Sequence, residues 1–547
     1  MPNEFLTTSW LSGKRPKPKL PAWLTERRRL TLSVQRRRLI YLTVATVGLF
    51  LLLERYQPEL SAVIVLTAMI VFYTIYLSTM FVVKRAVAKV SERVNLKLLA
   101  KLYQTHDFWP FNAKADLPLA PLEAFKAALA KATAKVWGDD GNVSISSLDE
   151  TNLPATQAEV CSLAPLVSVI VPAHNEAIVI RDTIFNLLEM QGVPFELLVI
   201  DDRSHDATPN ILSKLEQHLA QQGETRFRWY RRADEATPGK SAVLNEALAT
   251  TTTPYLLVFD ADAKVAPDFL SRLLPFVAEP TVADTVALVQ ARKAMSNADT
   301  NWLTMVQHLE YCFDAHVQTC RDAVQGAVEA RGNGMLVKRE ALLSVGGWND
   351  ASVTDDLDLS TRLHLQGWDI RFDSQATVYE EAILEALPLL RQRVRWAEGS
   401  LRRYLDNGWA VLCSGKVGLR TRIDMLVYLI EFLFPLLILA DNLLVIAMFM
   451  LGQGSQLHAL LSFSVLPVFA LCFIPALYVG IRRFERPSRW VSLQWAAQTM
   501  LYMLLIWGPV VYYTFVKVLL GPSNSFHWAK TTHYGANAAQ DLAALEC

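Results

Sequence analysis

Cysteine is scarce in this sequence, and the motifs that mark several common classes of soluble enzyme are missing. The 547 residues include six cysteines, with no CxxC pair and no grouping with histidine at zinc spacing. HExxH, G-x-S-x-G and Walker lysine motifs are also absent. Lys+Arg and Asp+Glu both total 53, so there is no global basic field to attract nucleic acid. We expect reduced thiols and no nucleic-acid partner.

Charge is scarce too, because charged residues make up 19% of the chain and hydrophobic residues 52%. The apolar residues gather in long runs toward the two ends: Leu39–Leu53, Leu60–Val83, Met425–Leu451, Leu457–Gly480 and Val491–Leu520. Runs of this kind predict membrane spans, about five of them to within one. The first run is short for a span. A secretory signal is its alternative interpretation, which the long basic segment before it disfavours.

Basic segments indicate how the spans are oriented. Residues 1–38 hold ten Lys/Arg against two Glu, and residues 481–489 hold four arginines against one Glu. The positive-inside rule puts both in the cytosol, whereas the uncharged GQGSQ at 452–456 suits the outside. From Arg85 to Lys101 a basic residue recurs every four positions. This predicts a basic amphipathic helix on the membrane surface, with a solvated helix face as the simpler alternative.

Between the two apolar regions, short β-rich runs alternate with helical stretches from Leu166 to about residue 400. The expected strands lie at residues 166–171, 195–200, 226–231, 254–259 and 286–291. This alternation predicts a doubly wound, mostly parallel α/β sheet. We therefore expect a soluble α/β domain held between membrane spans, with its active edge facing the cytosolic leaflet.

Four acidic or polar clusters follow the expected strands: PAHNE (172–176), DD (201–202), DAD (260–262) and TDD (354–356). In open α/β sheets, ligands bind beyond the carboxyl ends of the strands. Each cluster alone is a common turn or helix start. Their repetition at successive strand ends predicts a binding site. The two carboxylates of DAD offer hard oxygen ligands for Mg²⁺ or Mn²⁺, ions that assist the departure of a diphosphate.

Two further stretches carry basic groups. GKSAVLNEAL puts Lys240 in a Gly-Lys turn before a helix, which is either an anion site or only a helix start. In RQRVRW, a helical conformation would put Gln392, Arg395 and Trp396 on one face. Arg391 would share that face. The face can hold a diphosphate and stack on a sugar, or it can be a basic interfacial helix.

In this order, PAHNE, DD, DAD, TDD and QRVRW resemble the motif set of the membrane-bound inverting glycosyltransferases of family 2, over about residues 166–400. The resemblance implies a GT-A fold, which is Rossmann-like, and an inverting hexosyltransferase that uses a UDP-sugar. One departure is TDD where the polymer synthases often carry TED. Within the family, GKSAVLNEAL, VTDDLDLSTRLHLQGWDI and HWAKTTHYG are most similar to enzymes that transfer glucose from UDP-glucose to 1,2-diacylglycerol. A processive β-glycan synthase of the cellulose, chitin or hyaluronan type is the alternative.

The resemblance also implies residue roles. The uridine would be held by Ala173, Glu176, Asp201 and Asp202. The nucleotide-sugar would lie near Lys240 and Asp260. The Mg²⁺ (or Mn²⁺) would be bound by Asp260 and Asp262. The general base would be Asp356. The diphosphate and acceptor would be lined by Gln392, Arg395 and Trp396. A cytosolic gating segment that closes over UDP would contain Trp528, Lys530, Thr531 and His533.

A cytosolic gating segment conflicts with five spans and a cytosolic N-terminus, which would put the C-terminus outside. Either the last apolar run folds back at Gly508–Pro509, or part of Met425–Leu451 lies flat on the surface. A transporter or channel with a nucleotide-binding domain is a further alternative. For that class, Glu431 and Asp441 within an apolar run would mark a polar pathway.

The expected protein is a multi-pass protein of the cell membrane or the thylakoid with its catalytic domain in the cytosol. Its partners would be UDP-glucose, diacylglycerol and the bilayer. The expected divisions are a basic N-terminus (1–38), two transmembrane helices (39–83), a basic helix and linker (84–165), a GT-A domain (166–415), interfacial and transmembrane helices (416–521) and a C-terminal segment (522–547).

Overall fold

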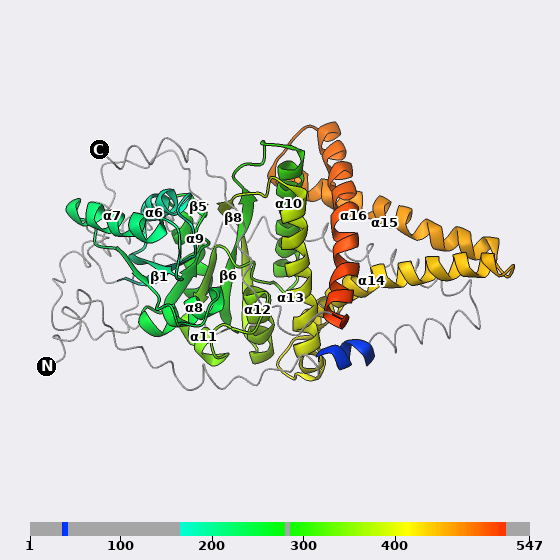
Figure 1. Ribbon diagram of the computed structural model, residues 1–547, viewed down its shortest axis with the longest axis horizontal. Coiled ribbons are helices and arrows are strands. Elements are labelled where there is room, and N and C mark those ends of the chain that lie inside the picture. Colours follow the sequence, from blue (N-terminus) through cyan, green and yellow to red (C-terminus); the bar gives the residue numbers. More distant parts are fainter. Residues whose placement is uncertain (1–34, 42–164, 279–284, 521–547) are drawn as a thin grey trace, which may run out of the picture.

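The computed structural model describes residues 35–41, 165–278 and 285–520, which include one sheet of eight strands (Figure 1). The strands are β1 (Val167–Ala173), β2 (Phe195–Asp201), β3 (Phe227–Arg231), β4 (Tyr255–Val258), β5 (Lys264–Val265), β6 (Val286–Met295), β7 (Met335–Lys338) and β8 (Asp369–Glu380). Their order across the sheet is β3-β2-β1-β4-β7-β6-β8-β5. The five predicted strands are confirmed as β1, β2, β3, β4 and β6.

The sheet has a parallel half and a mixed half. β1 pairs in parallel with β2 and β4, and β2 pairs in parallel with β3, as in a Rossmann-like unit. β7 is antiparallel to both of its neighbours, and β5 is antiparallel to β8. β6 and β8 pair in parallel, so the prediction of a mostly parallel sheet holds there and misses the antiparallel strands β5 and β7. These two strands have two and four residues, too few to show a period in the sequence.

Helices cover both faces of the sheet. One face packs against α6 (Ile180–Leu188), α7 (Thr208–Gln221) and α9 (Phe269–Ala278). The other face packs against α8 (Lys240–Thr250), α10 (Trp302–Ala323), α11 (Arg339–Ser344) and α12 (Asp355–Gln366). Within β1, Val169 belongs to the first core and Ile170 to the second. Burial on both faces explains why the strand reads as a continuous apolar run.

Four long helices follow: α13 (Ala386–Cys413), α14 (Leu419–Met450), α15 (Gln456–Phe484) and α16 (Arg489–Leu520). α16 lies beside α10 and α13, whereas α14 and α15 form a hairpin that runs away from the domain (Figure 1). Within the hairpin, His458 Nε2 and Asp441 Oδ1 lie 3.2 Å apart. The Asp441 carboxylate therefore ties α14 to α15.

Among the described residues, one helix, α16, is long and apolar enough to cross a membrane by length and composition. It is continuous through Gly508–Pro509, so the fold-back considered at this point is wrong. Proline costs a helix one backbone hydrogen bond but need not end it when packing supports the turn. The count of about five spans stays a prediction.

Several predicted segments lie outside the described residues: most of the first two spans, the linker to residue 164, the Glu431 side chain and the gating residues Trp528, Lys530, Thr531 and His533. Residues 35–41 are described and form a short helix. Leu39 packs there against Leu401 and Leu405 of α13, and Gln35 Nε2 donates to Asp406 Oδ1 at 2.8 Å. The start of the first apolar run is thereby fixed to α13.

Candidate active site

A cavity of about 320 Å³ lies where β1, β4 and β8 end and where α8, α10, α12 and α13 meet. These three strands point the same way, so their carboxyl ends share one edge of the sheet, as the sequence predicts for the ligand site. Eight of the predicted site residues line it: Glu176, Lys240, Asp260, Asp262, Asp356, Gln392, Arg395 and Trp396. The fold thus brings together residues that are up to 220 positions apart in the sequence.

Asp260 and Asp262 present two carboxylates to the cavity directly after β4. Lys240, the first residue of α8, donates from Nζ to Asp260 Oδ1 at 2.5 Å. Asp262 is 8% exposed, and its Oδ2 accepts from the backbone N–H of Glu381 at 2.9 Å. Burial disfavours the charged form of Lys240 and lowers its pKa. The neighbouring carboxylates, of which Asp260 has the largest effect, outweigh this and raise the pKa well above the ordinary value of a lysine. The lysine is therefore a cation at neutral pH.

Asp356 is the second residue of α12 and lies in the cavity wall. A Cβ on Gly332, which has φ +79°, would come within 3.2 Å of Asp356 Oδ2, so the backbone approaches the carboxylate closely. Burial, and then the negative charge of Asp355, raise the pKa of Asp356 to about 6. The carboxylate is ionised at neutral pH and can accept a proton.

The RQRVRW segment is helical and begins in the second turn of α13. Gln392, Arg395 and Trp396 line the cavity together, as predicted. Arg391 does not: it is exposed and is not part of the lining. Arg393 is fully buried instead and stacks on the ring of Trp396, with its guanidinium carbon 4.1 Å from the ring centroid.

Glu310 of α10 joins this arginine to α16. Its Oε2 accepts from Arg393 Nη2 at 2.7 Å and from the Tyr502 hydroxyl at 2.9 Å. Its Oε1 accepts from Trp507 Nε1 at 2.7 Å. Burial opposes the charge of Arg393, but Glu310 holds the pKa of this guanidinium far above its usual value. The Glu310 carboxylate thus binds both the Arg393 guanidinium, which stacks on Trp396, and two side chains of α16. No motif in the sequence reveals this connection.

Four residues at the ends of β1 and β2 are predicted to hold the uridine. Of these, Glu176 lines the cavity and the other three do not. Ala173, Asp201 and Asp202 are fully buried. Asp202 accepts from Arg232 Nη1 at 2.8 Å and from the backbone N–H of Gly239 at 3.1 Å, which holds the turn in front of α8. Their role toward uridine stays a prediction.

Further polar residues, which the sequence does not predict, also line the cavity. Glu380, at the end of β8, accepts from the Tyr311 hydroxyl at 2.7 Å and lies 2.9 Å from Lys293 Nζ. Arg331 donates from Nη2 to Asp314 at 2.8 Å. These residues belong to β6, α10 and β8 and to the loop before β7. Only a prediction of β8 would have placed Glu380 at the ligand edge.

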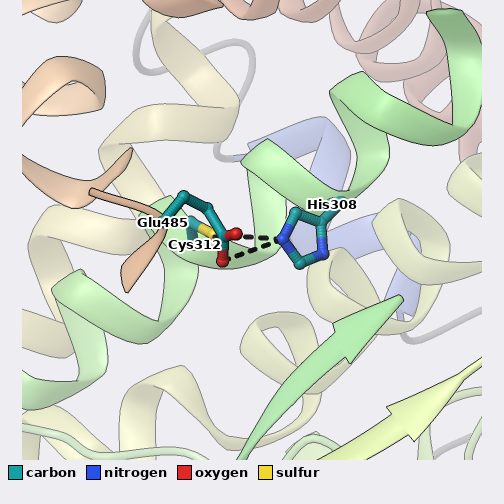
Figure 2. A group of neighbouring side chains, drawn as sticks. All are labelled: His308, Cys312 and Glu485. Atoms are coloured by element: carbon teal, nitrogen blue, oxygen red, sulfur yellow. Dashed lines mark hydrogen bonds and ion pairs between the residues drawn. The ribbon is translucent and has the colours of Figure 1, made fainter. Parts of the chain in front are cut away.

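Besides the two carboxylates that follow β4, one group of three potential metal ligands occurs among the described residues, and it lies outside the cavity. Figure 2 shows His308 and Glu485 turned toward each other, with Cys312 beside them. The backbone N–H of Met295 donates to His308 Nδ1 at 3.3 Å, so the ring proton sits on Nε2 and is donated to Glu485, 3.0 Å away. Arg292 Nη2 is 3.1 Å from the same carboxylate oxygen. A cation would have to displace both donors, so we interpret the group as a tie between α10 and the end of α15.

A Rossmann-like half-sheet with carboxylates at its ligand edge, closed by a basic helix, is typical of a GT-A type glycosyltransferase. Residues 164–399 match the sequence model of the family described as glycosyltransferase-like family 2. The chain is 36% identical over 392 residues to a β-monoglucosyldiacylglycerol synthase of Trichormus variabilis, covering 70% of this chain and 79% of the relative. A synthase of that name from Synechocystis sp. is 35% identical over 384 residues, covering 68% and 76%. The chain belongs to glycosyltransferase family 2.

Among solved structures, a mannosyltransferase from Pyrobaculum calidifontis in complex with GDP-Man and Mn²⁺ covers 74% of this chain and 99% of its own. The sequence identity is 18% and the TM-score 0.40, a similarity too remote to bear on the ligand.

Proposed function

We propose that the protein transfers glucose from UDP-glucose to the free hydroxyl of 1,2-diacylglycerol, with inversion, to give β-monoglucosyldiacylglycerol. The names of the two relatives, at 35–36% identity over about 70% of the chain, support the glucosyl group and the diacylglycerol acceptor. We further propose that the protein is a multi-pass membrane protein with its catalytic domain in the cytosol.

The observation that carries a lipid acceptor is the composition of the cavity wall. Asp356 shares the lining with Tyr428 of α14 and Trp507 of α16, the side chains that these two apolar helices contribute. A cavity that joins a general base to membrane-side aromatic residues suits an acceptor whose hydroxyl sits at headgroup level. A water-soluble acceptor would not need this wall.

The residues at the end of β4 fit a divalent cation. Asp260 and Asp262 are hard oxygen donors that face the cavity, few enough to leave positions open for phosphate oxygens. Lys240 donates to one oxygen of Asp260 and the backbone N–H of Glu381 donates to one oxygen of Asp262, so the protein orients both carboxylates. Mg²⁺ or Mn²⁺ held there would neutralise charge on the departing diphosphate.

The remaining groups suit a single in-line displacement. Asp356 removes the proton from the acceptor hydroxyl, and the oxygen attacks the anomeric carbon from the face opposite UDP. The bond from that carbon to the diphosphate oxygen breaks, and UDP leaves with the electron pair. Arg395 and Lys240 stabilise the negative charge that develops on the diphosphate. One displacement inverts the configuration, so no carboxylate nucleophile is required.

The test supplies UDP-[14C]glucose to the purified protein in vesicles that contain diacylglycerol. The expected product is one glucosyl lipid per transfer, recovered in the organic phase. Asp356→Asn should lower the rate of its formation about 10²–10⁴-fold while UDP still binds. Asp268→Asn, at an exposed carboxylate paired with Arg272 away from the cavity, should leave the rate unchanged. A long water-soluble or insoluble polymer would reject the lipid acceptor in favour of a processive synthase.

A further inference from the structure

We propose that Lys293 of β6 recognises a hydroxyl group of the donor hexose, and that Glu380 at the end of β8 positions this lysine. Neither residue belongs to a motif of the sequence, and the displacement proposed for the cavity uses neither. The inference rests on the proposed function, because it takes a UDP-hexose as the donor. It adds a residue that determines which sugar is accepted.

The pair of Lys293 and Glu380 is built into the wall of the cavity, which both residues line. Lys293 is level with Val378 of the parallel strand β8, so Glu380, two residues further on, projects from the same face of the sheet. Lys293 Nζ lies 2.9 Å from Glu380 Oε2, and the two side chains are only 14% and 12% exposed. Because little water competes for these groups, the ammonium is held more firmly than in an exposed ion pair.

The Glu380 carboxylate is occupied by donors of the protein. Its Oε1 accepts from the Tyr311 hydroxyl at 2.7 Å. Its Oε2 accepts from Asn333 Nδ2 at 3.0 Å as well as from Lys293. The three donors come from α10, from the loop before β7 and from β6. A carboxylate fixed on three sides suits a residue that positions the lysine and does not itself react.

The same group of side chains is tied to the two carboxylates that follow β4. Asn333 Oδ1 accepts from the backbone N–H of Asp260 at 3.1 Å. The residue after the positioning carboxylate, Glu381, donates its backbone N–H to Asp262 Oδ2 at 2.9 Å. The ammonium of β6 is therefore held in a fixed relation to the residues proposed to bind the diphosphate end of the donor. The hexose is bonded directly to that diphosphate, so it enters the same part of the cavity.

Two aromatic rings flank the ammonium of Lys293. Its Nζ lies 5.0 Å from the ring centroid of Tyr311 and 5.9 Å from that of Trp396. Small-molecule sites combine aromatic walls, which bind the apolar parts of a ligand, with a few polar groups that fix its orientation. A hexose that packs on Trp396 therefore brings its hydroxyl groups toward Lys293.

The ammonium also has a hydrogen-bond donor left for a ligand. A lysine ammonium carries three N–H donors. Within the described part of the chain, Lys293 Nζ has two acceptors, Glu380 Oε2 and the backbone carbonyl of Arg331 at 3.4 Å. A sugar hydroxyl accepts from the third N–H, whereas a deoxy carbon at that position leaves the donor unmatched. A sheltered donor without an acceptor costs binding free energy, and this cost makes the site selective.

The two other cations assigned to the reaction belong to a different side of the cavity. Lys240 donates to Asp260 at 2.5 Å, and Arg395 interacts electrostatically with Asp355 and Asp356. The ammonium of β6 pairs instead with the carboxylate at the end of β8. The cavity thus separates the cations suited to the diphosphate from the one suited to the sugar.

The experiment compares donors that differ by one hydroxyl group. UDP-glucose and its 2-, 3-, 4- and 6-deoxy analogues are supplied in turn to the full-length protein in vesicles that contain diacylglycerol. Lys293→Met should lower kcat/KM for UDP-glucose about 10–100-fold and leave kcat/KM unchanged for the one analogue that lacks the recognised hydroxyl. The intrinsic reactivity of each analogue is the same with both enzymes, so it cancels when the ratios are compared.

Three controls separate this role from a structural one. The Kd for UDP, measured by calorimetry, should stay unchanged in Lys293→Met, because the proposed contact is to the sugar. Glu380→Gln should weaken the discrimination against the same analogue, because an amide holds an ammonium less firmly than a carboxylate does. Lys338→Met is the matched control: this lysine also lies over a ring, 5.7 Å from the centroid of Trp368, but outside the cavity lining, and its loss should change no ratio.

An equal loss of kcat/KM for all donors in Lys293→Met would overturn the proposal, and so would ratios that do not change. A raised KM for diacylglycerol with unchanged donor ratios would overturn it as well, because it would assign the lysine to the acceptor. A wild-type protein that transfers no glucose would overturn the proposed function and this inference with it. The other outcomes require an active wild type, so they bear on Lys293 alone.

Discussion

The raised pKa of Asp356 makes the acid limb of the pH–rate profile a sharp test of the general base. A base works only when ionised, so kcat/KM should fall as the pH drops through about 6. With that pKa, the ionised fraction falls from about 0.9 at pH 7 to about 0.1 at pH 5, an about tenfold loss of rate. An aspartate at its ordinary value would lose less than about 10% over the same range.

The assay is the initial rate of glucosyl transfer into the organic phase, at subsaturating UDP-glucose and constant ionic strength. Asp355→Asn supplies the structural control, because it removes the negative charge that helps to raise the pKa of Asp356. Its acid limb should move to lower pH, and the ratio of rates at pH 5 and pH 7 should rise toward one. Asp356→Asn should lower the rate about 10²–10⁴-fold at every pH. Two results would refute the assignment of Asp356 as the base. One is a wild-type kcat/KM that stays constant between pH 7 and pH 5, and the other is an acid limb whose pH does not change in Asp355→Asn.

Three further predictions test the metal site, the buried network and the packing of α13. Asp262→Asn should raise the Mg²⁺ concentration for half-maximal rate at least about tenfold, checked by metal titration at fixed UDP-glucose. Glu310→Gln leaves a buried arginine without its counter-charge and should lower the free energy of unfolding by about 3–5 kcal/mol, against about 1–2 kcal/mol for Tyr502→Phe, compared by denaturant unfolding in detergent. Gly399→Ala puts a methyl group into Thr354, the residue before α12, and should reduce kcat more than it changes the Kd for UDP measured by calorimetry.

Periodicity predicts the parallel half of the fold well because β1 and β2 are long and buried on both faces. It fails at β8, where DIRFDSQATVYE carries charged and polar side chains along the strand. Those side chains are satisfied by partners distant in sequence, such as Asp322, which accepts from Arg371 Nε at 2.7 Å. A strand whose polar groups find partners only in the folded chain has no local signature. Glu380 at its end was therefore beyond prediction.

The site shows the same division between ordered motifs and tertiary contacts. DAD, TDD and QRVRW converge on one cavity because each follows or borders an element that ends at the same edge of the sheet. Their resemblance, in this order, to the motif set of the family predicted that convergence. Glu310 and Trp507 carry no motif, and their positions depend on how α10 and α16 pack. Packing of this kind is set by the whole fold and not by any short stretch.

The arginines of α13 show what helical periodicity can and cannot decide. The rule that places Gln392 and Arg395 on one face also places Arg391 there, and the rule assumes that a helix has one functional side. α13 has two: it borders the cavity on one side and packs on α10 and α16 on the other. Arg393, which points to the second side, is fully buried, whereas Arg391 projects outward. The buried arginine stacks on Trp396 and is itself held by Glu310, so the helix that lines the cavity is positioned by the same carboxylate that holds α16.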